Sequence, residues 1–252
     1  MRPGHLAPIV IVLLAGCGQR AAQSVRDARA EGDLPADSQT ALDANDDTGP
    51  VPPGDAGGFD AGPLPPDIAG CADGTREGFA DAGRWPRIAA CSGAWSLPGL
   101  LDDDARTPHC DRAAGNDGTV PGGEDCSAAD LCSAGWHLCA GADDVRTHSP
   151  TGCLGATPAE TPRFFAAAQG ASAAGTCSPV PDPASANNLH GCANIGDLDD
   201  ISCVPLERIL SFATCATTGV WHCGGSDEWL REAAVVTKDG PALGGVLCCS
   251  ND

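Results

Sequence analysis

The sequence has few positive charges for its length. Its 252 residues include 14 Lys and Arg against 34 Asp and Glu, and its formal charge is −20. Nucleic acids are bound mainly through Lys and Arg side chains that neutralise phosphates, and anionic lipid surfaces attract basic segments. The composition therefore argues against a nucleic-acid partner and against docking on lipid through a basic patch. The excess of negative charge indicates a well-hydrated, exposed surface.

Aromatic side chains are also scarce. The chain has no Tyr, five Trp and five Phe, so a folded domain has little bulky apolar material for a core. Cysteine is abundant instead, and fourteen of the fifteen cysteines lie in one region. An even number confined in this way predicts a closed disulfide framework made in an oxidising compartment. Their pairing cannot be read from the sequence, and the candidates are Cys71, Cys91, Cys110, Cys126, Cys132, Cys139, Cys153, Cys177, Cys192, Cys203, Cys215, Cys223, Cys248 and Cys249.

The remaining cysteine, Cys17, follows a short apolar segment at the start of the chain. Residues 1–16 carry Arg2 and then an apolar run of about eleven residues, as a signal peptide requires. The run is too short to cross a hydrocarbon core of about 30 Å as a helix. It ends in Leu14-Ala15-Gly16-Cys17, which resembles the lipobox of bacterial lipoprotein precursors.

This resemblance implies cleavage before Cys17 and lipidation of its thiol. One acyl chain binds a membrane reversibly, whereas two or more give stable anchoring, so the lipoprotein would stay in the cell envelope. In that class an Asp directly after the lipidated Cys often retains the protein at the inner membrane. Residue 18 is Gly, which indicates the outer membrane.

Residues 17–70 form an acidic segment rich in Pro, Gly, Ala and Asp, with Phe59 as their single aromatic residue. Such a segment cannot bury enough apolar surface to offset its chain entropy. We expect a disordered tether with a root-mean-square reach of about 40 Å. The Cys-rich globular domain then comprises residues 71–252.

Regular structure is expected to be sparse in this domain, because Gly, Pro and Asp interrupt most runs. Three short helices are predicted: one from Pro162 through Phe164 and Phe165 to Gln169, one from Pro205 to Phe212, and one after an N-cap at Ser226. Strands are predicted over residues 87–91, 136–139, 234–237 and 245–249. The sequence thus predicts a small, disulfide-rich and loop-rich α+β domain with short helices and an antiparallel sheet.

Two segments, residues 131–145 and 214–229, share a layout. Each has a Cys, a small-residue turn, a Gly, Trp-His, a second Cys and an acidic helix start. The pattern predicts a helix stapled to a strand whose Trp packs inward, followed by a turn into a second helix. It is interpreted either as a recurrent way to bury a Trp beside a disulfide or as a duplicated half-domain.

Four histidines lie within two residues of a Cys: His109, His137, His190 and His222. Zinc prefers converging thiolates and imidazoles, usually with a Cys-x₂₋₄-Cys pair. No Cys-x-x-Cys occurs, and an oxidising compartment favours disulfides, so a zinc site is disfavoured. His137 and His222 are also disfavoured as general bases, because no nucleophile-elbow sequence accompanies them.

Acidic clusters are the other candidate site. Carboxylates in loops supply the hard oxygen ligands that calcium takes, although none of the clusters matches the twelve-residue calcium loop. The simpler interpretation is solvated loop carboxylates, so no cofactor is expected. If a metal binds, we expect calcium, and the candidate ligands are Asp102, Asp104, Asp117, Asp197 and Asp199.

The domain also carries a pattern near Trp136. Cys132, Gly135, Trp136 and Leu138, followed by acidic residues, resemble C-type-lectin-like and link-type modules. Those modules close with a Trp, a Cys and a final apolar strand ending in Cys, as residues 221–223 and 246–248 could. The calcium–sugar signatures Glu-Pro-Asn and Gln-Pro-Asp of that family are absent from the chain. The resemblance therefore implies no specific binding residues.

Three functions remain open. The favoured hypothesis is a non-catalytic, disulfide-stapled domain that binds an unknown glycan or protein from a membrane anchor. The alternatives are a secreted hydrolase that uses paired carboxylates and a purely structural envelope component. A concave pocket near the tryptophans with nearby carboxylates would favour the first two, and a perturbed carboxyl pair across a cleft would favour the enzyme. The tryptophans are Trp85, Trp95, Trp136, Trp221 and Trp229.

Overall fold

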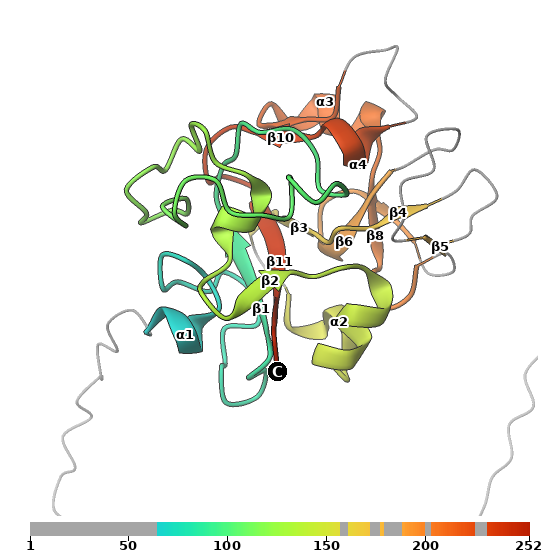
Figure 1. Ribbon diagram of the computed structural model, residues 1–252. Coiled ribbons are helices and arrows are strands. Elements are labelled where there is room, and N and C mark those ends of the chain that lie inside the picture. The colour runs from blue at the N-terminus through green and yellow to red at the C-terminus, as the bar shows by residue number, and fades with distance from the viewer. Residues whose placement is uncertain (1–64, 157–160, 172–176, 179–187, 200–202, 225–230) are drawn as a thin grey trace, which may run out of the picture. The chain divides into compact units, whose positions relative to one another are not determined.

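The structure is a computed structural model that describes residues 65–156, 161–171, 177–178, 188–199, 203–224 and 231–252 (Figure 1). Cys17, the expected signal peptide, most of the expected tether and the helix expected after Ser226 lie outside these residues. The short helix α1 (Pro66–Ala69) falls in the range expected for the tether, and Ala69 is buried. Within the described ranges no helix is long and apolar enough to cross a membrane.

The domain is built on a seven-stranded sheet. Its strands follow the order β1-β11-β3-β6-β8-β7, and β2 also pairs with β11. The pairing of β3 with β11 is parallel and the other pairings are antiparallel. The strands are β1 (Ile88–Ser92), β2 (Trp136–Leu138), β3 (Phe164–Ala166), β6 (Leu189–Ala193), β7 (Asp197–Leu198), β8 (Arg208–Leu210) and β11 (Gly244–Ser250).

Short elements surround this sheet. Two further two-stranded sheets pair β9 with β10 and β4 with β5. All helices in the described part of the chain are seven residues long or shorter. The fold is therefore the small, disulfide-rich α+β domain that the sequence predicts. The elements are η1 (Ala128–Leu131), α2 (Ala142–His148), η2 (Gly152–Gly155), β4 (Gly170–Ala171), β5 (Cys177–Ser178), α3 (Phe212–Thr218), β9 (Trp221–His222), α4 (Glu232–Val235) and β10 (Thr237–Lys238).

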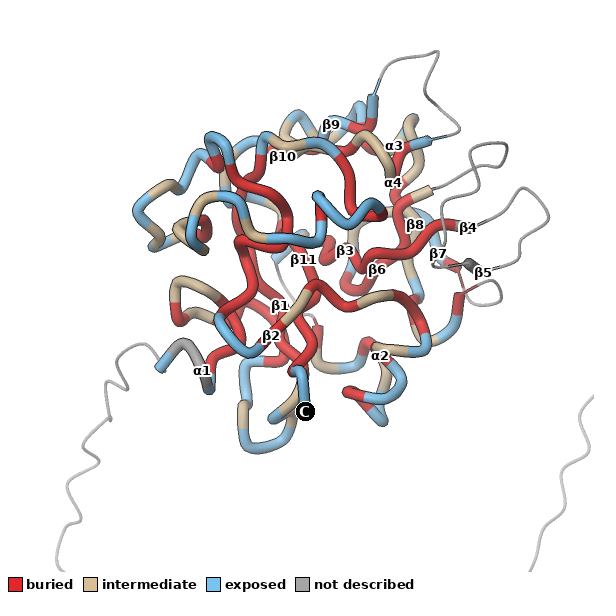
Figure 2. Tube along the Cα trace, viewed as in Figure 1, coloured by how far each residue is buried: buried red, intermediate tan, exposed pale blue. Residues whose placement is uncertain are grey.

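Strand β11 lies at the centre of the domain and is buried along its whole length (Figure 2). One of its edges pairs with β1, and the other is shared by β3 and β2. Successive side chains of a strand point to opposite faces. Val246 and Cys248 therefore pack in one apolar cluster, whereas Leu247 and Cys249 pack in a second cluster. The sheet is covered on both faces.

Small residues let the central strands approach closely. A Cβ atom at Gly191 of β6 would lie 2.2 Å from the carbonyl oxygen of Phe165, and one at Gly245 of β11 would lie 2.1 Å from that of Cys91. No side chain fits at these distances. Glycine therefore occupies positions where neighbouring strands approach most closely, and aromatic side chains lie in the apolar clusters. There, Phe164 and Trp95 both contact Trp221 edge to face.

All fourteen candidate cysteines form disulfides, as the sequence predicts. Five bridges join residues 8 to 39 positions apart, and two join η1–β2 to β11 across 116 and 110 positions. The neighbours Cys248 and Cys249 point to opposite faces of β11, so each bonds a different partner. The pairs are Cys71–Cys91, Cys110–Cys126, Cys132–Cys248, Cys139–Cys249, Cys153–Cys192, Cys177–Cys203 and Cys215–Cys223.

Of the predicted strands, residues 87–91, 136–139 and 245–249 are confirmed within one residue at each end by β1, β2 and β11. The predicted helix from Pro162 to Gln169 is wrong, because Phe164 to Ala166 form β3. Phe164 belongs to one apolar cluster and Phe165 to the other. A strand between two covered faces can place adjacent side chains in both clusters, whereas a helix cannot.

The predicted helix from Pro205 to Phe212 is also wrong. Arg208 to Leu210 form β8, whose Ile209 pairs with His190 of β6 on one side and Asp197 of β7 on the other. The helix starts later, at Phe212, because Ser211 is its N-cap and its Oγ accepts from the Thr214 N–H. Pairing on both sides overrides the helical spacing of the apolar residues.

The predicted strand over residues 234–237 is wrong for its first half. Glu232 to Val235 form α4, and only Thr237 belongs to a strand, β10. The Val236 N–H donates to the Glu232 carbonyl at 3.0 Å, which closes a helical turn. Ala233 and Val236 are both buried. Two buried residues three positions apart fit one face of a helix. A short apolar run by itself does not distinguish a helix from a strand.

The two segments of similar layout share a shape but differ in their covalent bonds. Trp136 and Trp221 are both buried on short strands, and α2 follows the first of them as predicted. In the second segment Cys215 of α3 bonds Cys223 after β9, so the helix is stapled to its strand. Both cysteines of the first segment instead bond β11. The segments therefore bury their Trp in the same way, within different disulfide frameworks.

Candidate functional site

An apolar pocket opens between the loop after α2 and the segment that leads into β8. Its volume is about 450 Å³, which is in the range of small-ligand sites. Its apolar lining includes Cys153, Leu154, Val204, Pro205 and Leu206. The sequence singled out Cys153 as a disulfide candidate and Pro205 as the start of a helix. It predicted no pocket, because the two walls lie about fifty residues apart in the chain.

Disulfides and hydrogen bonds hold both walls. The Cys153–Cys192 bridge joins the first wall to β6, and the second wall begins at Cys203, which bonds Cys177. Ser149 Oγ donates to the Gly152 carbonyl at 2.6 Å. Gly152 has a φ of +58°, and a Cβ there would lie 2.8 Å from Pro205 Cβ. A glycine therefore allows the walls to meet at this point.

The rim of the pocket is apolar and exposed. Leu154 is 70% exposed and Val204 is 51% exposed, and they are two of the four large exposed apolar residues in the part of the chain that the structure describes. The Val204 carbonyl accepts a hydrogen bond from Arg146 of α2, which holds this edge in place. Exposed apolar side chains gathered around a hollow mark an interaction site.

Two carboxylates, Asp199 and Glu207, also line the pocket. Their backbones are joined, since the Asp199 N–H donates to the Glu207 carbonyl at 2.8 Å. Asp199 Oδ2 lies 3.1 Å from Nδ1 of His190, whose side chain is 1% exposed. Burial lowers the pKa of His190, so its imidazole is neutral at pH 7.

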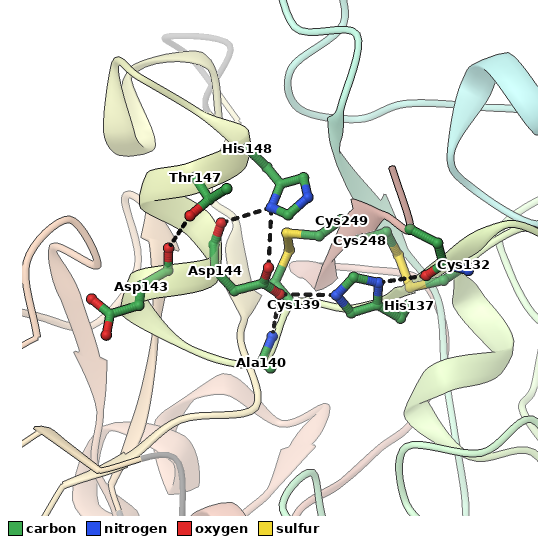
Figure 3. A network of polar contacts seen from close by, with 11 residues as sticks. Cys132, His137, Cys139, Ala140, Asp143, Asp144, Thr147, His148, Cys248 and Cys249 are labelled. Carbon is green, nitrogen blue, oxygen red and sulfur yellow. Dashed lines mark hydrogen bonds and ion pairs between the residues drawn. A yellow bond between two sulfur atoms is a disulfide. The ribbon is translucent and has the colours of Figure 1, made fainter.

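A second polar site lies around Asp144 in the first turn of α2 (Figure 3). Its carboxylate accepts from the Ala140 N–H at 2.7 Å and from His137 Nε2 at 3.0 Å. Nδ1 of His148, one turn further along α2, lies 3.0 Å from the same carboxylate. His137 also contacts Asn251 Oδ1 through Nδ1 at 2.8 Å. One carboxylate thus joins β2 and α2, beside the Cys139–Cys249 bridge.

The electrostatics of this site follow from these contacts. The hydrogen bond to Asp144 raises the pKa of His137, against burial, which lowers it. Burial would raise the pKa of the Asp144 carboxyl, but His137 and the Ala140 N–H together lower it below its ordinary value. Both ring nitrogens of His137 are engaged, so the ring is placed to carry a proton rather than to accept one from a substrate.

His137 also lines an open groove of about 350 Å³ together with Asp103, Arg106 and Thr107. Arg106 forms an exposed ion pair with Asp103 at 2.9 Å. The groove therefore holds charges of both signs. Thr107 Oγ1 also donates to the Asp103 carbonyl at 2.8 Å, so the polar groups of the groove are paired within it.

The structure does not gather the calcium candidates. Asp102 and Asp104 are exposed, Asp117 accepts from Thr75 Oγ1 at 3.3 Å, and Asp197 accepts from Thr214 Oγ1 at 3.3 Å. Among the described residues, none of these four joins a group of three converging metal-ligating side chains, whereas Asp199 joins His190 and Cys203. Calcium binding stays a prediction.

Three described groups bring at least three potential ligand atoms within 4.8 Å of one another, and each contains a disulfide-bonded Cys. None offers a thiolate while its bridge is intact. Of the remaining histidines near a Cys, His109 contacts the Asp104 carbonyl at 3.1 Å and His222 contacts Asp239 at 2.9 Å. Both contacts involve exposed side chains.

The tryptophans mostly belong to the core. Trp95 and Trp221 are buried, Trp85 is half-buried against Phe79, and Trp229 lies outside the described residues. Trp136 is also buried, but its edge lines a hollow of about 400 Å³. Among the residues that the structure describes, no Trp lines the pocket with Asp199 and Glu207.

Sequence reasoning missed several buried charged residues, among them Lys238 and Glu77. Lys238, the single Lys of the chain, is fully buried and donates to the Gly93 and Gly240 carbonyls at 3.0 and 2.6 Å. Burial lowers its pKa to about 7. Burial raises the pKa of Glu77 to about 7, although the Ser92 N–H donates to its carboxylate. Neither Lys238 nor Glu77 lines the hollows described above. Both therefore hold backbone groups of the core through their hydrogen bonds.

No family model matches the chain, and no solved structure matches its fold. Its function is therefore argued from its own residues.

Proposed function

We propose that this chain is an envelope lipoprotein, anchored in the outer membrane through acyl chains on Cys17, and that its disulfide-stapled domain binds a protein or glycan partner. The observation that carries the proposal is the cysteine pairing. Seven bridges use fourteen of the fifteen cysteines and leave Cys17. Bridges of this density belong to exported proteins, and the remaining thiol follows a signal-peptide segment.

The preformed pocket supports the binding part of the proposal. Its walls are fixed covalently, so little conformational freedom would be lost on binding, which favours affinity. Residues 18–64 would act as a tether with a reach of about 40 Å or slightly less. Such a tether lets the domain meet partners away from the lipid surface. The exposed apolar rim of the pocket supports a protein partner.

The anchor is tested by expressing the full chain in a diderm bacterium with a labelled fatty acid. Wild-type protein should take up label and sediment with outer membranes. Cys17→Ala should take up none, and should either be released from the membrane or accumulate as unprocessed precursor. Gly18→Ala is the matched control and should behave as wild type. Label and membrane attachment that survive in Cys17→Ala would overturn the anchor.

A further inference from the structure

A hollow of about 400 Å³, here named the β11 hollow, lies where the end of β11 meets β2 and the segment before β1. Its size is in the range of small-ligand sites. Backbone hydrogen bonds hold its walls together. The Ser250 N–H donates to the Arg87 carbonyl, and the Asn251 N–H donates to the Gly135 carbonyl, both at 3.0 Å. Ser250 also pairs with Trp136 of β2. The three segments are therefore fixed before any ligand binds, which favours affinity.

Two planar polar side chains of this hollow are held in place from outside it. Asn251 Oδ1 accepts from Nδ1 of His137 at 2.8 Å, and Nε2 of the same ring lies 3.0 Å from the Asp144 carboxylate (Figure 3). The amide oxygen therefore faces His137, and Nδ2 remains as a donor. Arg87 donates through one Nη atom to the Thr147 carbonyl, and its guanidinium has further N–H groups. Both side chains thus keep donors for a ligand.

Ser250 adds a polar group that the protein itself does not satisfy. The residue is 6% exposed, and its Oγ is buried with no hydrogen-bond partner among the described residues. A buried hydroxyl without a partner is costly, because it has lost its hydrogen bonds to water. Beside it, the Trp136 ring carries the Arg76 guanidinium at 5.5 Å from its centroid and lines the hollow with its edge. A ligand that brings a polar group to Ser250 and apolar surface to Trp136 would complement both.

The charges of the β11 hollow favour a neutral ligand. Among its described lining residues, Arg87 is the one cation and Asp252 the one carboxylate. An anion would meet Asp252 and the formal charge of −20 of the whole chain, and a cation would meet Arg87. A wholly apolar ligand would leave the Ser250 hydroxyl and the Asn251 amide without partners. A sugar ring is neutral, carries hydroxyl groups that both donate and accept, and has apolar C–H surfaces.

We propose that the β11 hollow binds one pyranose ring of a glycan, with hydroxyl groups at Asn251 and Ser250 and C–H surface against Trp136. This inference rests on the proposed function as a displayed binding domain and assigns a glycan to this site. The apolar pocket shares no lining residue with the β11 hollow, so the two sites can be tested separately.

The test uses the purified full-length protein in a zwitterionic detergent, which has no sugar headgroup. Saturation-transfer NMR titrations compare the methyl glycosides of glucose, galactose, mannose and N-acetylglucosamine with cyclohexanol, which keeps a six-membered ring but has a single hydroxyl group. At least one glycoside should bind with a Kd of about 10 mM or lower. It should also bind about tenfold more tightly than cyclohexanol, a difference of about 1.4 kcal/mol.

Variants place the binding at this hollow. Ser250→Ala should weaken the glycoside about fivefold and leave Tm unchanged or higher, because the hydroxyl has no partner in the free protein. A purely structural role would not give this combination. Ser133→Ala is the matched control, because Ser133 Oγ is also buried and unpartnered but does not line the hollow. It should keep wild-type affinity. Asn251→Ala should weaken the glycoside about fivefold or more, and scanning calorimetry shows that each variant is folded.

Three results would overturn the inference. Absence of binding by all four glycosides would remove the ligand class. Equal affinity for cyclohexanol and the glycosides would show that the hydroxyl groups are not recognised. Wild-type affinity in both Ser250→Ala and Asn251→Ala would place the binding elsewhere. None of these results affects the test of Cys17, so failure of the glycan site and failure of the anchor are distinguishable.

Discussion

The carboxylate of Asp144 allows a sharp test of what holds α2 to the sheet. Asp144→Asn keeps the size of the side chain but replaces one acceptor oxygen by a donor NH₂ group. The wild-type carboxylate accepts from the Ala140 N–H at 2.7 Å and contacts His137 and His148 at 3.0 Å each, and its side chain is 17% exposed. In the variant, the new NH₂ group therefore faces at least one of these N–H donors and cannot accept its hydrogen bond.

The expected cost follows from these contacts. Hydrogen bonds to charged groups contribute about 1.5–3 kcal/mol each, and His137, being 36% exposed, can recover part of its loss from water. We expect Asp144→Asn to lower the free energy of unfolding by about 3 kcal/mol, a fall in Tm of about 6–12 °C for a domain of this size.

The neighbouring Asp143→Asn is the matched control. Asp143 is 96% exposed and pairs with Arg146 three residues later on α2. Exposed pairs of this kind contribute about 1 kcal/mol or less. Scanning calorimetry of wild type and both variants gives the comparison. A fall in Tm for Asp144→Asn no larger than that for Asp143→Asn would refute the proposed role of Asp144.

The difference between wild type and Asp144→Asn should also depend on pH. The pKa of His137 is raised above 6.5, so its contribution is complete below that pH and is lost as pH rises through the raised value. The pKa of Asp144 is lowered below 3.8, so its contribution is present above that pH and is lost as pH falls through the lowered value. The difference should therefore be largest between about pH 4 and 6.5. A difference that stays constant from pH 3 to 9 would contradict this account.

Three further predictions concern the core. Non-reducing peptide mapping should find seven bridges, with Cys248 and Cys249 bonded to cysteines before and after β2 and not to each other. Gly191→Ala should lower the free energy of unfolding by about 2 kcal/mol or more, measured by urea denaturation, because its Cβ would lie 2.2 Å from a backbone oxygen. Lys238 has a pKa of about 7 in the folded state and 10.5 when unfolded, so wild-type stability should rise between these pH values, and the Lys238→Met variant should not share this rise.

The sequence predicted the strands that carry a local signal. Residues 87–91 and 245–249 are short, apolar and bounded by turn residues, and both form strands in the centre of the sheet. The failures have a common cause, which is that local spacing is ambiguous in short apolar runs. Phe164 and Phe165 lie in a sequence rich in Ala, yet they form β3 because each side chain enters a different apolar cluster. That requirement comes from residues far away in the chain.

The pocket could not be predicted for a related reason. Its walls near Leu154 and Val204 are held by two separate bridges, Cys153–Cys192 and Cys177–Cys203, and disulfide connectivity cannot be read from sequence. Asp199 was singled out only as a candidate calcium ligand in a loop. Its surroundings depend on the pairing of β6 with β8, which places His190 behind it.

The two long bridges explain how a domain with so few aromatic residues can hold a central strand. Cys132–Cys248 and Cys139–Cys249 join β11 to residues 116 and 110 positions earlier. Closing a long loop removes more freedom from the unfolded chain than closing a short one, about 4–5 kcal/mol for about 100 residues in the chain-entropy account. Because adjacent residues of a strand face opposite ways, the two bridges fix β11 from both faces of the sheet. Large side chains are then not needed there, and small residues such as Gly245 can bring the strands into close contact.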